Sequence, residues 1–474
     1  LNVNGYISNA TGSTFSQSGG AINIDGNDNG TTATSVASGI PLLGFGSSSA
    51  QFATNTISLT GGTLTIVDPH AASPNTNAYA IYAYLSSGIN VNANTAHTVN
   101  FGDGTSTQSG GNTSGFYWTG YAGTGRLNLG TVVVNNPSGT NRNVTQTGTN
   151  VINGNFTITA GTYDQNSATT IIGGNLAVAG TLVASGTTAF GVTTGTTLAQ
   201  QTVAQSVSVS GTGSIQNLAT SPTTNFSTVS FNNTSSTGVT LNPLNQVVAN
   251  TSVAASVSTG ITFNGKVTTT DGKALLWGTA TSGTNTGLTV TSGGMTPGSA
   301  FARGWNAAHD GTNINGSALP TATNSQFPLI DSAGNERHAW IQRVTPTATG
   351  ILAVTYTDAS GTVDVTIPDG AYTVEKRTQG KWSVSALGST PSATTFKLAI
   401  TGTNAFGGVL ATANARVTSA SGVLGTNQTG TTLPHAQRIG LTLAELTGND
   451  FYMGINSAEI TYQTLASGNC NDGA

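Results

Sequence analysis

A short sequence motif that recurs at an interval of 20 residues limits the folds that this chain can adopt. Residues 155–163 read NFTITAGTY and residues 175–182 read NLAVAGTL, and residues 57–66 show the same alternation of apolar and polar side chains. Such alternation directs one side of a strand into a core and the other into solvent. Strands that repeat at roughly this period are typical of a solenoid, in which each turn buries its apolar face against the next. The pattern therefore predicts a parallel β-helix.

The pattern changes near Lys266, where charged residues become more frequent and the apolar segments lengthen. Segments such as 351–356 and 396–400 then recur with Gly, Pro, Asp or Asn between them, which is typical of an antiparallel β-sandwich. We therefore predict an all-β chain, a parallel β-helix (solenoid) followed by an antiparallel β-sandwich domain. The predicted boundaries are residues 1–285 for the solenoid, 286–462 for the β-sandwich domain and 463–474 for a C-terminal tail.

Charged side chains are almost missing from the first 265 residues. The chain has 13 Lys and Arg in 474 residues, and only Arg126 and Arg142 precede Lys266, while the first Glu is Glu336. Acid–base, nucleophilic and metal chemistry all use ionisable side chains, so we expect neither an enzyme nor a bound cofactor. A polysaccharide-degrading enzyme built on a β-helix would need clustered acids or a basic cleft. Binding to nucleic acid is not expected either, because it needs a basic face.

The composition is typical of an exported protein. Lys, Glu and Met are scarce, and Cys470 is the one cysteine of the chain, so no intrachain disulfide can form. No stretch reaches the roughly 18–20 apolar residues that span a bilayer, so we predict no membrane span. Because the chain begins at Leu1 without a positively charged segment, we expect that any signal peptide has been removed. The predicted location is extracellular, at the cell surface.

Several short sequence motifs resemble motifs in secreted modules of Bacteroidota surface proteins. They are FPLI at residues 327–330, KWSV at 381–384 and YQTLASGN at 462–469, and Cys470 stands where such modules usually have Trp. The repeated phrases of the predicted solenoid are similar to the β-helical stalks of the same proteins. The resemblance implies a cell-surface adhesin or fibre with a β-helical stalk and a C-terminal β-sandwich module, exported through a dedicated secretion system.

Two short motifs are candidate sites for an ion or a modification. Asp25, Asn27 and Asn29 match the first half of an oxygen-ligand calcium loop, but Val36 stands where the bidentate Glu is expected. A turn rich in Asn and Gly explains that stretch without a metal, so we predict no metal site. The Asp-Ser-Ala triplet that contains Ser332 resembles the O-glycosylation acceptor of Bacteroidota, with an ordinary turn as the alternative.

Aromatic and ionisable side chains gather in few places. Tyr117, Trp118 and Tyr121 could stack on a sugar, whereas packing of these rings into a corner of the solenoid is the interpretation we favour. Residues 309–310 (His-Asp) and 336–338 (Glu-Arg-His) are the close groupings of ionisable side chains. We expect each to be a surface turn with a solvated ion pair rather than a catalytic pair.

Strand-like segments at the two ends of the chain suggest how it functions. The residues concerned are Leu1, Val3, Tyr6 and Ile7 in the first segment and Ile460, Tyr462 and Leu465 in the last. Unpaired strands can pair between copies, and head-to-tail contacts of this kind generate an open filament. We therefore expect a structural subunit of an extracellular bacterial filament or surface fibre, whose partners are copies of itself. The alternative is a cell-surface adhesin or glycan-binding module that binds surface glycans and does not polymerise.

Overall fold

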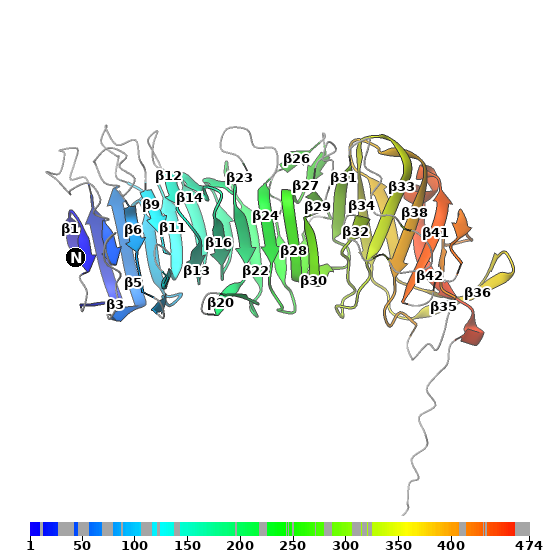
Figure 1. The fold of residues 1–474 in the computed structure, drawn as a ribbon, viewed down its shortest axis with the longest axis horizontal. Coiled ribbons are helices and arrows are strands. Elements are labelled where there is room, and N and C mark those ends of the chain that lie inside the picture. Colours follow the sequence, from blue (N-terminus) through cyan, green and yellow to red (C-terminus); the bar gives the residue numbers. More distant parts are fainter. Residues whose placement is uncertain are drawn as a thin grey trace, which may run out of the picture. The chain divides into compact units, whose positions relative to one another are not determined.

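The computed structural model divides the chain into two compact units, which are described separately (Figure 1). The first comprises Leu1–Val248 with Ser252–Asp271, and the second comprises Ala249–Thr251 with Gly272–Ala474. The predicted boundary after residue 285 lies further along the chain than this division. Strand β29 (Ala274–Trp277) belongs to the second unit, because it pairs with β31 (Ala300–Trp305).

The structure describes residues 1–9, 13–26, 42–45, 56–68, 79–86, 89–105, 116–120, 124–136, 143–194, 197–217, 225–242, 244, 246–248, 251–270, 272–278, 287–305, 314, 320, 325–406, 414–429, 431 and 434–459.

Short strands follow one another from residue 2 to residue 269. They are β1 (Asn2–Asn4), β2 (Ile7–Asn9), β3 (Thr14–Asp25), β4 (Leu43–Phe45), β5 (Thr56–Asp68), β6 (Tyr79–Ala83), β7 (Asn90–Asn92), β8 (His97–Phe101), β9 (Phe116–Thr119), β10 (Arg126–Asn128), β11 (Thr131–Asn135), β12 (Asn143–Gln146), β13 (Asn150–Ile152) and β14 (Phe156–Ala160). They continue as β15 (Thr162–Asp164), β16 (Thr169–Ile172), β17 (Leu176–Val178), β18 (Thr181–Val183), β19 (Thr187–Phe190), β20 (Val192–Thr194), β21 (Thr197–Ala199), β22 (Gln205–Val209), β23 (Ser214–Gln216), β24 (Phe226–Phe231), β25 (Val239–Leu241), β26 (Gln246–Val248), β27 (Thr251–Val253) and β28 (Ala255–Thr269).

Parallel pairing dominates the first unit. One ladder runs β1–β3–β5–β8–β11–β14–β17–β22–β25–β28, a second runs β13–β16–β19–β24–β28, and a third runs β2–β4–β6–β9–β12–β15–β18–β23. The recurring phrases of the sequence lie side by side, because Phe156 pairs with Leu176 and Tyr163 pairs with Leu182. The structure is therefore all-β with large parallel sheets, which the alternation and its period predicted.

The core of the first unit consists of apolar columns that run across the ladders. One column passes through Leu64, Val99, Val132, Phe156, Leu176, Val207 and Leu241, each at most 1% exposed. Each of these residues is an inward-facing apolar residue in the alternating pattern of its strand. The strands therefore pair in the register that keeps all of these side chains in the core. Burying a side chain of this size contributes about 1.5–3 kcal/mol to folding. Beside this column stands a half-buried row of hydroxyls, Thr63, Thr98 and Thr131, which stacks without charge repulsion.

Some polar side chains inside the first unit form a buried hydrogen-bond network. Gln146 Oε1 accepts hydrogen bonds from the Tyr163 hydroxyl at 2.7 Å and from Thr170 Oγ1 at 2.6 Å, and Gln146 Nε2 donates to two backbone carbonyls. Gln165 Nε2 donates to Thr170 at 3.0 Å. Burial raises the pKa of Tyr163, so its hydroxyl stays a neutral donor.

Antiparallel pairing takes over in the second unit. Its strands after β29 are β30 (Leu288–Met295), β31, β32 (Gln326–Phe327), β33 (Ala339–Ala348), β34 (Gly350–Thr357), β35 (Thr362–Asp369), β36 (Tyr372–Thr378), β37 (Lys381–Ala386), β38 (Ser392–Thr401), β39 (Arg416–Thr418), β40 (Thr426–Asn427), β41 (His435–Leu441) and β42 (Asp450–Ile455). One antiparallel series is β31–β34–β37–β42–β39, with the hairpin β35–β36 joined to β42, and another is β32–β33–β38–β41–β40.

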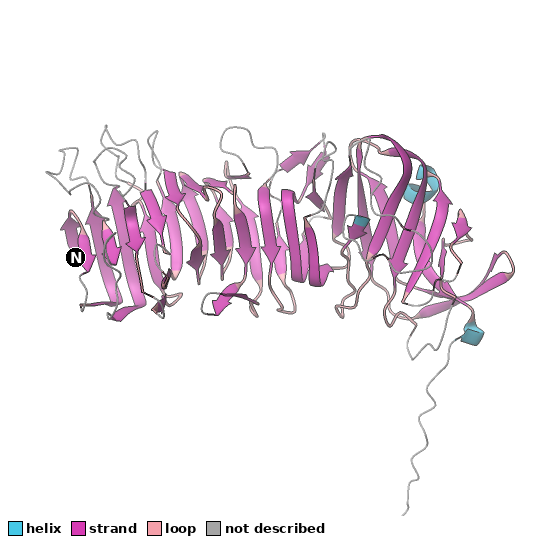
Figure 2. Ribbon diagram, in the orientation of Figure 1, coloured by secondary structure: helices cyan, strands magenta, loops and turns pink. Residues whose placement is uncertain are grey.

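Helix is scarce, as Figure 2 shows. The helix α1 (Leu443–Gly448) begins with a capping box in which the Thr442 hydroxyl accepts from the Glu445 N–H and the Glu445 carboxylate accepts from the Thr442 N–H. The 3₁₀ helix η3 (Ser457–Glu459) follows β42. Across the described ranges, no helical segment has the length and apolar character that a bilayer crossing needs.

Candidate functional site

The open edge of the first unit is formed by β1 and β2. β1 pairs with β3 and β2 pairs with β4, and no described strand pairs with their outer edges. The Leu1 carbonyl and the Gly5 N–H each bond to β3 at 2.8 Å. Because successive residues of a parallel strand direct their backbone groups alternately to the two sides, the N–H and C=O groups of Asn2 and Asn4 face the outer edge.

Two of the most exposed large apolar side chains of the described residues lie on this edge. Leu1 is 74% exposed and Tyr6 is 43% exposed, while Val3 and Ile7 are half-buried. An edge that offers both unpaired backbone groups and apolar side chains is a template for a further strand. The segment predicted to supply that strand, with Ile460, Tyr462 and Leu465, lies outside the described residues.

The aromatic cluster predicted around residue 117 is largely inside the first unit. Trp118 has no exposed surface, and its ring lies 5.7 Å from that of Phe101 and 6.1 Å from that of Tyr163. The interpretation that Trp118 stacks on a sugar is therefore wrong, because core side chains cover its ring. Tyr117 is half-buried beside it, and Tyr121 lies outside the described residues.

Asp25 of the predicted calcium motif is the last residue of β3. It is half-buried and pairs in register with Asn4 of β1 and Asp68 of β5. Asn27 and Asn29 lie outside the described residues. Nowhere in the described parts of the chain do three or more His, Cys, Asp or Glu side chains gather as they would around a metal ion.

A buried ion pair in the second unit replaces the solvated turn expected at residues 336–338. Arg337 Nη2 lies 2.7 Å from Asp331 Oδ2, and the two side chains are only 6% and 8% exposed. The expectation of a solvated pair was wrong. It assumed that Arg337 pairs with an adjacent residue, whereas its partner is Asp331, six residues earlier across a turn. Glu336 is 61% exposed, and its nearest oxygen lies 4.0 Å from His338 Nε2.

The same turn holds both members of the pair in place. Asp331 Oδ1 accepts from the Asn335 N–H at 2.8 Å, and Oδ2 accepts from the Asn335 side-chain amide at 2.9 Å. Arg337 Nη1 donates to the Thr403 carbonyl at 2.6 Å, and Nε donates to the Tyr356 hydroxyl at 3.3 Å. Because a carboxylate, a backbone carbonyl and a phenol oxygen all accept from Arg337, the guanidinium has one orientation.

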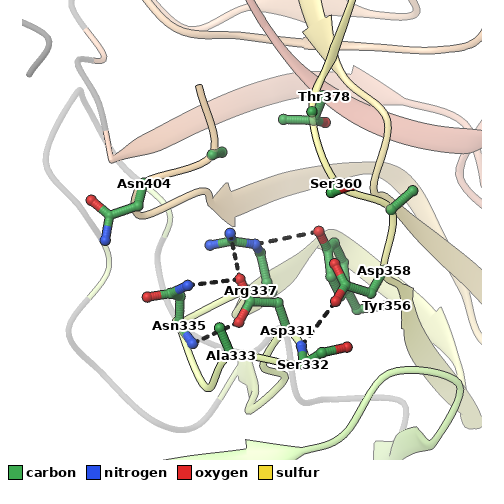
Figure 3. Close-up of a pocket in the computed structure, with 13 residues that line it drawn as sticks. Asp331, Ser332, Ala333, Asn335, Arg337, Tyr356, Asp358, Ser360, Thr378 and Asn404 are labelled. Carbon is green, nitrogen blue, oxygen red and sulfur yellow. Dashed lines mark hydrogen bonds and ion pairs between the residues drawn. The ribbon is translucent and has the colours of Figure 1, made fainter. Parts of the chain in front are cut away.

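Asp331, Asn335, Arg337 and Tyr356 line part of a pocket of about 290 Å³ (Figure 3). Its wall combines the turn at 331–337, the end of β34 with the residues after it, Thr378 of β36, and residues 404–405. Ser332, the predicted glycosylation site, lies exposed at this pocket, and its backbone N–H donates to Asp358 Oδ2 at 2.9 Å. Sequence reasoning missed the pocket, because its wall comes from segments up to about 70 residues apart.

The electrostatics of the pocket are set by burial. Burial raises the pKa of Tyr356, and the hydrogen bond from Arg337 opposes that shift, so the phenol is neutral and can donate. Outside the pocket, burial lowers the pKa of His338, which the Glu336 carboxylate opposes. The groups at the pocket can hydrogen-bond a ligand.

No protein-family model, curated protein or solved structure matches this chain. Its function is therefore argued from its own geometry.

Proposed function

We propose that this chain is a structural subunit of an extracellular bacterial filament or surface fibre that assembles head to tail through its terminal strands. In this proposal the first unit is a parallel β-helix and the second unit is an antiparallel β-sandwich. The three parallel ladders, in which Phe156 pairs with Leu176, support the first assignment. The two antiparallel series support the second. The resemblance to Bacteroidota stalks and modules is consistent with both.

The observation that carries the proposal is the outer edge of β1 and β2. The edge combines the outward backbone groups of Asn2 and Asn4 with the exposed side chains of Leu1 and Tyr6. The partner strand we assign is the segment at Ile460–Leu465 of a second copy, in which residues 460–463 alternate apolar and polar. Because the two contacting surfaces differ, each added copy presents a free surface to the next, and successive copies form an open polymer when the rotation between them does not close a ring.

Electron microscopy of the untagged protein at several concentrations tests the proposal. We expect regular filaments from residues 1–474, and dispersed particles after deletion of residues 1–7 or of residues 460–474. Polymers formed by both deletion variants would refute the assembly contact.

A single backbone N–H provides a sharper test. Asn4→Pro removes the outward N–H of Asn4 and leaves the bonds between β1 and β3 to Leu1 and Gly5 in place. The matched control Asn4→Ala removes the side chain and keeps the N–H. We expect filaments from the alanine variant and not from the proline variant, with equal circular dichroism spectra. Equal polymerisation of the two variants would contradict strand pairing at this edge.

The alternative, a non-polymerising adhesin, is favoured by the polar pocket near Arg337 rather than by Trp118. Dispersed monomers at every concentration would favour this alternative.

A further inference from the structure

We propose that the pocket beside Arg337 binds one neutral saccharide residue, a single hexose ring held by hydrogen bonds. The pocket lies entirely in the second unit, so the proposal does not depend on filament assembly.

The wall of the pocket is already organised for a ligand. Arg337 is fixed by Asp331 at 2.7 Å, by the Thr403 carbonyl at 2.6 Å and by the Glu336 carbonyl at 2.8 Å. Asp331 is in turn fixed by the two bonds from Asn335. Binding to such a wall needs little reordering of side chains, which reduces the entropic cost of association.

The pocket also holds hydrogen-bonding groups with capacity to spare. Asp358 bonds to Ser332 through Oδ2, which leaves Oδ1 able to accept. The Tyr356 oxygen accepts from Arg337 Nε, which leaves its own proton able to be donated. Asn404 is a lining residue (Figure 3) and is exposed, and its amide can both donate and accept. Sugar hydroxyls also donate and accept at every position, so a wall with donors and acceptors side by side suits them.

Charge and size select the class of sugar. Two carboxylates, Asp331 and Asp358, and one guanidinium, Arg337, line the pocket, so an anionic ligand meets net repulsion. A volume of about 290 Å³ is at the small end of ligand pockets, which suits one ring rather than an extended chain. The Tyr356 ring is only 3% exposed and packs 4.9 Å from the Trp382 ring, so recognition uses hydrogen bonds rather than stacking.

A turn presents Asn404 at the pocket. Its φ is 58°, in the left-handed region, which Asn adopts more readily than other non-glycine residues.

The test titrates the full chain with the methyl glycosides of glucose, galactose and mannose. Binding is followed by saturation-transfer NMR of the ligand and by tryptophan fluorescence, since Trp382 packs on Tyr356. We expect at least one glycoside to saturate with a Kd on the order of 1 mM, as befits a small ligand held without stacking. Methyl glucuronide, which has a carboxylate on the same ring, should bind at least about tenfold more weakly.

Variants locate the binding. Asn404→Gly keeps the left-handed backbone and removes the amide, and Asp358→Asn removes the charge and keeps one acceptor oxygen. Each should weaken binding about fivefold or more, because one or more hydrogen bonds to the sugar are lost. Asp364→Asn is the matched control, since Asp364 is 85% exposed, pairs with Lys376 and does not line the pocket.

Three results would overturn the proposal. The first is the lack of saturation by all three glycosides at about 50 mM, well above the expected Kd. The second is an unchanged Kd in both pocket variants with their thermal midpoints intact. The third is tighter binding of the glucuronide than of the neutral sugars. Because the titration uses protein dilute enough to be monomeric, none of these results bears on the filament.

Discussion

Replacement of Asp331 by alanine should destabilise the second unit more than any surface change. The Asp331 carboxylate accepts one charge-assisted bond from Arg337 at 2.7 Å and two bonds from Asn335 at 2.8 and 2.9 Å. Its loss leaves the guanidinium, 6% exposed, without its carboxylate. Breaking a buried pair by removing one partner costs about 3–5 kcal/mol, because the remaining charge is buried and uncompensated.

Urea unfolding at pH 7 measures this cost, followed by tryptophan fluorescence. The second unit contains four of the five tryptophans, and Trp382 Nε1 donates to the Arg337 carbonyl at 2.7 Å, so the signal reports the affected region. A loss of about 4 kcal/mol lowers the unfolding midpoint by about 2 M urea at a slope of about 2 kcal/mol per M. Asp331→Asn, which keeps an acceptor for Asn335, should cost about half as much.

The control for this experiment is Asp364→Asn, which breaks an ion pair with Lys376. The Asp364 side chain is 85% exposed. Its midpoint should change by no more than the equivalent of about 0.5 kcal/mol. A midpoint for Asp331→Ala equal to that of the control would refute the argument that the buried pair holds the turn.

Three further predictions concern the first unit, each measured by thermal unfolding. Phe156→Ala should lower the free energy of unfolding by about 3–5 kcal/mol, because it opens a cavity in the apolar column next to Leu176. Tyr163→Phe should lower it by only about 1 kcal/mol, because Gln146 keeps its other hydrogen bonds. Burial lowers the pKa of His97 below 6.5, so the unfolded chain takes up the proton first and stability falls as the pH drops below 6.5. His97→Gln should lose less stability than the unchanged chain between pH 7 and pH 5, since glutamine does not titrate.

Each of these predictions has a result that contradicts it. A change below about 1 kcal/mol for Phe156→Ala would mean that the column is not tightly packed. A cost for Tyr163→Phe as large as that for Phe156→Ala would mean that the polar network, rather than the apolar column, dominates the interior. Equal pH dependence with and without His97 would show that other groups cause the acid sensitivity.

Strand periodicity could be predicted from the sequence because it is local. In residues 155–163 and 175–182 the apolar side chains alternate, and alternation alone decides which face of a strand is buried. Their equal spacing also predicts the register, since a slip by one residue would turn Phe156 and Leu176 out of the core. The predicted candidate residue Ser332 lies at the pocket, although no pattern in the sequence indicated the pocket itself.

Contacts between distant segments were decided only by the tertiary structure. Trp118 of β9 is buried because the rings of Phe101 of β8 and Tyr163 of β15 pack against it, and Arg337 is buried because Asp331 lies across a turn and Thr403 supplies the carbonyl opposite. Such contacts depend on how strands and turns pack together and not on the alternation within any one strand. The sequence by itself determined strands, their faces and a nearly uncharged surface for the first unit, whereas the packing of strands and turns determined which side chains meet to form a core, an ion pair or a pocket.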